Sequence, residues 1–183
     1  MITSTTMAMY PAYHEVYQTI LLDLSGKEIF SEKPMLRLIK EACMSNGASY
    51  DGKIKAVRHA LRYHRKTPLM ISKEQNIYAF PTMSPEHYDC IWLFHLHIKE
   101  FTSSGNTTLI HFKNGFSFEI KSSIDVLNKQ RERSATLMNY FADFPPYNDH
   151  RLTELHPAEE NVFQHIHLPI PKSPITIENH FQT

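Results

Sequence analysis

The stretch FKNGFSFEI, Phe112 to Ile120, decides the fold class of this chain of 183 residues. Its dipeptide Asn114-Gly115 is a strong signal for a hairpin turn between antiparallel strands. After the turn, Phe116, Phe118 and Ile120 would point to one side and the polar residues between them to the other. That alternation predicts a half-buried strand, and therefore an antiparallel sheet.

Other short apolar runs, bounded by turn sequences such as Lys73 to Asn76 and Ser103 to Asn106, also predict strands. Near the start of the chain, Val16 to Leu24 and Glu28 to Phe30 flank the turn Ser25-Gly26-Lys27 and predict a hairpin. The remaining predicted strands are Leu69 to Ile71, Ile77 to Phe80, Ile91 to Phe101 and Thr108 to Phe112.

Two helices follow from period-3.6 patterns. Pro34 suits a first helical turn, and Gly47 suits the position just after a helix ends. The long run Ile124 to Phe141 predicts an amphipathic helix that packs on the sheet. We therefore predict an α+β protein: a mainly antiparallel sheet of about five to seven strands with a basic helix, a long C-terminal amphipathic helix and an extended tail.

The basic helix is predicted from KIKAVRHALRYHRK, Lys53 to Lys66, which has six Lys or Arg residues and no acid in a chain of 19 bases and 19 acids. Apolar residues recur through it at helical spacing, and basic residues repeat that spacing one position later. On one continuous helix, the basic residues would span about 80° of a single face. The basic positions with this spacing are Lys55, Arg58, Arg62 and Arg65.

A basic face can simply be solvated, but such faces usually carry acids that relieve like-charge repulsion, and this one carries none. A polyanion would supply the missing negative charge, so nucleic acid is the favoured partner. The strands lack the aromatic and basic run typical of RNA-stacking sheets. Our DNA-contact candidates are Lys53, Lys55, Arg58, Arg62, Arg65, Lys66 and Lys99, with Lys129, Arg131 and Arg133 as a second tier.

Catalytic chemistry has little support in the sequence. The nucleophile elbow, the P-loop, the dinucleotide-binding loop and the zinc-protease motif are all missing, so we expect neither an enzyme nor a cofactor. Cys43 and Cys90 lack the C-x-x-C spacing and are expected to be buried thiols. His95 and His97 share one face of a predicted strand and could give a metal two ligands, but a zinc site needs more. A metal-binding protein is therefore an alternative.

Residues 143–183 contain six acids, two bases and six prolines, which predicts an acidic, Pro-rich tail after a single domain of residues 1–142. A protein-interaction module that uses this tail is a further alternative, and the tail could bind the basic helix and inhibit it. The first residues do not resemble a secretion signal, and no apolar window has the length of a membrane span. We expect a cytoplasmic protein.

A series of short motifs resembles the ComK family of bacterial competence transcription factors. The resemblance covers about residues 46–141, and its motifs follow one another in order at compatible spacing. They are GASYDGK (Gly47 to Lys53), KTPLMIS (Lys66 to Ser72), QNIYAFPTMS (Gln75 to Ser84), CIW (Cys90 to Trp92), HLHIKEF (His95 to Phe101) and FKNGFSFEI (Phe112 to Ile120).

This resemblance implies a positive regulator of DNA-uptake genes that binds promoter sites made of paired A-runs and T-runs, largely through the minor groove. It also implies dimers that pair on the DNA, association with the nucleoid, and removal by a Clp protease with an adaptor, which would bind around Phe163 to Ile170. An A/T-tract target agrees with the charge pattern, because narrow minor grooves attract Arg and Lys.

Overall fold

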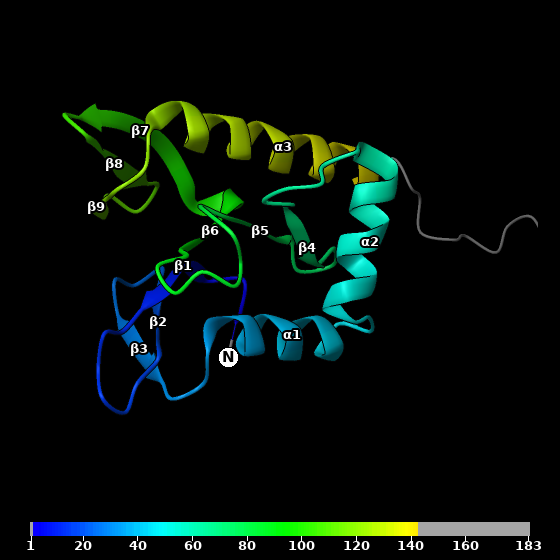
Figure 1. Cartoon of the computed structure of the whole chain (residues 1–183), viewed down its shortest axis with the longest axis horizontal. Coiled ribbons are helices and arrows are strands. Elements are labelled where there is room, and N and C mark those ends of the chain that lie inside the picture. Colours follow the sequence, from blue (N-terminus) through cyan, green and yellow to red (C-terminus); the bar gives the residue numbers. More distant parts are fainter. Residues whose placement is uncertain (1, 143–183) are drawn as a thin grey trace, which may run out of the picture. The chain divides into compact units, whose positions relative to one another are not determined.

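The structure is a computed structural model that describes residues 2–142, in which nine strands form two antiparallel sheets beside three α-helices (Figure 1). One sheet has six strands in the order β3-β2-β1-β6-β5-β4, and the other has the order β7-β8-β9. The predicted α+β class is confirmed. The elements are β1 (Thr6–Pro11), β2 (Thr19–Asp23), β3 (Glu28–Ser31), α1 (Met35–Ser45), α2 (Tyr50–Leu61), β4 (Leu69–Ser72), β5 (Ile77–Pro81), β6 (Trp92–Phe94), β7 (Ile98–Ser104), β8 (Thr107–Phe112), β9 (Ser117–Ile120) and α3 (Ile124–Ala142).

The predicted acidic tail, its proposed adaptor segment and its suggested contact with the basic helix lie outside the described residues. The division into a domain of residues 1–142 and a tail therefore stays a prediction. Within the described part, no helix combines the length and the apolar character needed to cross a membrane.

The predicted single strand from Ile91 to Phe101 is wrong. A short 3₁₀ helix, His95–His97, divides it into β6, which belongs to the six-stranded sheet, and β7, which belongs to the three-stranded one. The division has a physical reason, because Phe94 and Ile98 are both buried but belong to different apolar clusters. On one straight strand, Phe94 and Ile98 would point to the same face and could not enter two different clusters.

Strand β1 is the element that sequence patterns miss. It is a central strand, paired with β2 on one side and with β6 on the other, where Met9 lies opposite Trp92. Residues Thr6 to Met9 are all buried, so both faces of the strand are covered and no apolar-polar alternation results.

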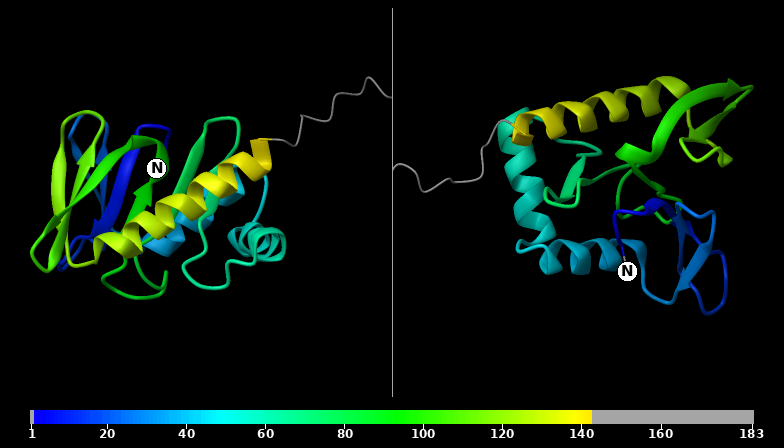
Figure 2. Two further views of the ribbon diagram at one scale, coloured as in Figure 1. Left: turned by 90° about the horizontal axis from the view of Figure 1, so that it is seen from above. Right: turned by 180° about the vertical axis from the view of Figure 1, so that it is seen from behind.

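Apolar clusters cover both faces of the six-stranded sheet. Leu38 and Ile39 of α1 and Ile54 of α2 pack on one face. The three-stranded sheet and the start of α3, through Leu127, pack on the other. The last turns of α3 meet α2 in a third cluster that includes Val57 and Leu137. Helix α3 thus runs from β7 at one end to α2 at the other (Figures 1 and 2).

Candidate nucleic-acid interface

Helix α2 begins with a side-chain cap. Ser49 has an extended backbone, and its hydroxyl accepts a hydrogen bond from the Gly52 backbone N–H at 3.1 Å. Asp51 places a negative charge in the first turn, where the helix dipole favours it. Ile54 and Val57 are buried and attach one side of the helix to the core. The opposite side is therefore free to carry charge.

The helix ends at Leu61, earlier than the basic pattern predicts. Arg62 adopts left-handed angles, φ 59° and ψ 27°, and its N–H donates to the Arg58 carbonyl at 3.1 Å. The predicted single basic face is consequently wrong, because Arg65 and Lys66 follow on a loop. The chain must reach Thr67-Pro68 and enter β4, and a residue before proline disfavours helical angles.

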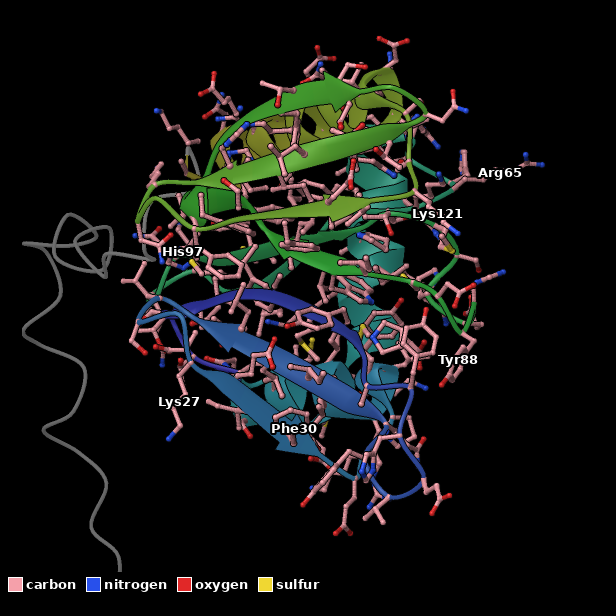
Figure 3. All side chains as sticks on the ribbon, turned by 90° about the vertical axis from the view of Figure 1, so that its left-hand side faces the viewer. Lys27, Phe30, Arg65, Tyr88, His97 and Lys121 are labelled. Carbon is pink, nitrogen blue, oxygen red and sulfur yellow. The ribbon has the colours of Figure 1, made fainter. Side chains whose placement is uncertain are left out.

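Side chains tie this loop back to the helix. The Thr67 hydroxyl donates to the Tyr63 carbonyl at 2.6 Å and accepts from Arg58 Nε at 3.2 Å. From α3, Arg133 Nη1 donates to the Arg65 carbonyl at 3.1 Å, and its guanidinium lies 5.0 Å from the Tyr63 ring centre. Side chains of α2 and α3 therefore both bond to the loop. The Arg65 side chain projects away from the ribbon (Figure 3).

The six predicted basic residues of this region have different environments. Lys53 is half-buried, and its Nζ donates to the Ile71 carbonyl of β4 at 2.7 Å, so it has a partner inside the fold. Four of the other five are exposed, although Arg58 also donates to Thr67. The fifth, Lys66, is half-buried and has no hydrogen bond or ion pair within residues 2–142. We call these five residues the α2 basic surface: Lys55, Arg58, Arg62, Arg65 and Lys66.

The remaining candidates lie elsewhere or serve the fold. Lys99 is on β7, and its Nζ lies 3.7 Å from a carboxylate oxygen of Glu100. Arg131 donates to the Ile98 carbonyl at 3.3 Å. Lys129 is exposed on the first half of α3. Of the second-tier candidates, Arg133 is the one shown to contact the loop that carries Arg65.

Glu86, an acid from outside α2, lies near Arg58 of the α2 basic surface. The pKa of Glu86 lies below its usual value because the Ser84 hydroxyl and a backbone N–H donate to the carboxylate, and because Arg58 and Lys40 place positive charge near it. Sequence reasoning did not single out Lys40 of α1. The short connection from α1 to α2 was the available signal, since it makes the two helices neighbours.

The two histidines of the 3₁₀ helix have structural surroundings. His97 Nε2 lies 2.8 Å from the Ser4 carbonyl, which requires the ring to donate. His95 Nδ1 is buried and has no hydrogen-bond partner in the described part of the chain. Within residues 2–142, no group of three or more His, Cys, Asp or Glu side chains could hold a metal ion. The described residues therefore supply no further ligands for the metal-binding alternative.

Comparisons with known proteins agree on one family. The family model described as ComK protein matches residues 1–143. The competence transcription factor of Bacillus subtilis (strain 168) is 30% identical over 131 residues, which cover 68% of this chain and 67% of that protein. Among solved structures, none matches the chain.

Proposed function

The chain belongs to the ComK family, and we propose that it is a transcription activator of competence genes that binds double-stranded DNA through the α2 basic surface. Family membership and the name of the Bacillus subtilis relative support the regulatory role. The observation that carries the DNA-binding part is the group of neighbouring cations whose charge the described residues leave largely unpaired.

Phosphates account for this group better than solvent does. Like charges on neighbouring turns cost a few tenths of a kcal/mol per pair, roughly, and DNA phosphates would offset that repulsion. Three of the five residues are arginines, whose planar guanidinium groups bind phosphate oxygens in pairs. The loop that carries Arg62 and Arg65 extends beyond the end of the helix, which suits insertion into a narrow A/T-tract minor groove.

The proposed target has two parts, an A-run paired with a T-run, and we propose that two copies of the chain occupy it. Association with the nucleoid follows from the same activity. Removal by an adaptor and the Clp protease is a separate proposal, which a tail deletion tests. Unchanged turnover in cells after deletion of residues 143–183 would contradict adaptor binding there.

Fluorescence-anisotropy titration tests the DNA-binding proposal. A duplex with paired A- and T-tracts is compared with a G/C-rich duplex of equal length at several salt concentrations. We expect tighter binding to the A/T duplex and a log–log salt slope of about −4.5 per bound copy, from five neutralised phosphates. Equal binding that high salt removes from both duplexes would reduce the site to a non-specific basic patch and contradict sequence-specific activation.

A further inference from the structure

Exposed apolar side chains concentrate on one edge of the six-stranded sheet. Within residues 2–142, six of the ten exposed large hydrophobic side chains belong to residues 13–30. Phe30 is 49% exposed and Ile29 is 40% exposed, although both lie in a strand. The ring centres of Tyr17 and Phe30 are 5.4 Å apart, so the aromatic surface continues from β3 onto the neighbouring loop. Patches of this kind often mark interfaces with other proteins.

Strand β3 also has unpaired backbone groups. It forms one edge of the sheet, and its only neighbouring strand within the described residues is β2. The Lys27 carbonyl accepts from Asp23 N–H and the Ser31 carbonyl from Gln18 N–H, both at 2.9 Å, so odd-numbered residues face β2. Since the direction alternates along a strand, the N–H and C=O groups of Glu28 and Phe30 point outward.

The other edge of the same sheet is different. Three of the four residues of β4 are buried, and both α1 and α2 contact this strand. Every residue of β3 is at least partly exposed, and Figure 3 shows Phe30 and Lys27 along this open edge. Ile29 and Phe30 at its centre are neither charged nor proline, the residue types that commonly protect an open edge.

We propose that β3 pairs with β3 of a second copy of this chain, antiparallel, about a two-fold axis at Ile29. Outward-facing residues must form the hydrogen-bonded pairs, so Glu28 of each copy faces Phe30 of the other and four backbone hydrogen bonds form. A register centred on Phe30 would instead place Glu28 opposite Glu32, and one centred on Glu28 would place two Glu28 carboxylates together. Charge therefore selects the Ile29 register.

This pairing deepens the proposed function, because it names the contact through which two copies would share a DNA site. It leaves the α2 basic surfaces free, since α2 contacts β4 at the opposite edge of the sheet. The paired copies would form one continuous sheet of twelve strands, with a basic surface toward each end. The pairing involves only the sheet, so it is tested without DNA.

Cross-linking by an introduced cysteine tests the register directly. In this arrangement Ile29 lies in a non-hydrogen-bonded pair with its own copy, where Cα atoms are about 4.5 Å apart, within the range of a disulfide. We expect Ile29→Cys to form a disulfide dimer under mild oxidation. The matched control is Phe30→Cys, because its two copies would lie about 8 Å apart, beyond disulfide reach. Both native cysteines are buried, so the unsubstituted chain is the blank.

Charge reversal adds a test that needs no oxidation. Phe30→Glu would face Glu28 twice in the dimer, and we expect the dimer dissociation constant measured by sedimentation to rise about tenfold or more. Glu28→Lys added to Phe30→Glu should restore the dimer. Phe116→Glu, an exposed aromatic of the β8–β9 turn, should have no effect.

The outcomes separate this proposal from DNA binding. A chain that is monomeric at the concentrations used, or Cys variants at positions 29 and 30 that cross-link equally, would overturn β3 pairing and leave the DNA-binding proposal intact. A dimer that cross-links through Ile29→Cys supports the pairing whether or not it binds the A/T duplex.

Discussion

Replacing Arg62 by glycine should make the protein more stable and a weaker DNA binder. Arg62 has φ 59°, and a left-handed residue with a Cβ atom costs roughly 1–2 kcal/mol. Glycine removes that cost but makes the unfolded chain more flexible, at about 0.4–1 kcal/mol. The backbone hydrogen bond to the Arg58 carbonyl does not depend on the side chain. We expect a net gain of about 0.5–1 kcal/mol, or a rise of about 2 °C in Tm.

The same change removes one cation from the α2 basic surface. Loss of one phosphate contact should reduce the salt slope from about −4.5 to about −3.6 per bound copy and weaken binding about eightfold at 0.1 M salt. Urea unfolding measures the first effect, and anisotropy titration of the A/T duplex at several salt concentrations measures the second. Opposite signs exclude misfolding as the cause of weaker binding.

Asn76→Gly is the matched control. Asn76 also has a positive φ, 53°, but it lies in the turn between β4 and β5 and has no charge. This variant should gain stability, by less than Arg62→Gly because asparagine tolerates left-handed angles, and should keep the original salt slope. An Arg62→Gly variant that is less stable, or that keeps the salt slope of the unsubstituted protein, would contradict the roles given to Arg62.

Three further predictions use other contacts. Lys53→Met removes the donor to the β4 carbonyl and should lower the free energy of unfolding in urea by about 1 kcal/mol with no change in salt slope; a slope reduced by about 0.9 would place Lys53 on the DNA. Ser49→Ala removes the helix cap and should cost about 1 kcal/mol in the same assay, whereas an unchanged midpoint would show that the cap contributes nothing. Burial, with the charges of Arg131 and Lys113, lowers the pKa of His95 to about 4, so the unfolded chain binds more protons and stability should fall as pH drops from about 6.5 toward 4. His95→Gln should reduce this decline, and a variant with the same pH profile as the unsubstituted protein would contradict the assignment.

The local parts of the fold are predictable from the sequence, and the non-local parts are not. The hairpin of β8 and β9 follows from Asn114-Gly115 and the alternation beside it, and α3 follows from a long periodic run. Strand β1 lacks such a pattern because both of its faces are buried. The break at His95–His97 depends on which apolar cluster receives each neighbouring side chain, and that depends on tertiary packing.

The candidate site divides in the same way. The local excess of positive charge is evident from the sequence, and so is a helix that carries part of it. The conformation of the loop after Leu61 also involves a distant residue, because Arg133 of α3 contacts the Tyr63 ring and donates to the Arg65 carbonyl. Lys53 likewise depends on a distant residue, because its Nζ donates to the Ile71 carbonyl of β4. Spacing along the sequence could not distinguish it from the cations around it.

The central position of β1 has a consequence for synthesis of the protein. One edge of β1 pairs with β2, and the other pairs with β6, where Leu93 lies opposite Ala8. A ribosome that adds about 5–20 residues per second needs about 4–17 s to make the chain between those two residues. Because β6 joins β1 to β5, the β3-β2-β1 part and the β5-β4 part of the sheet can unite only after Trp92 to Phe94 are made, and until then the apolar edge of β1 has no partner strand within the described residues.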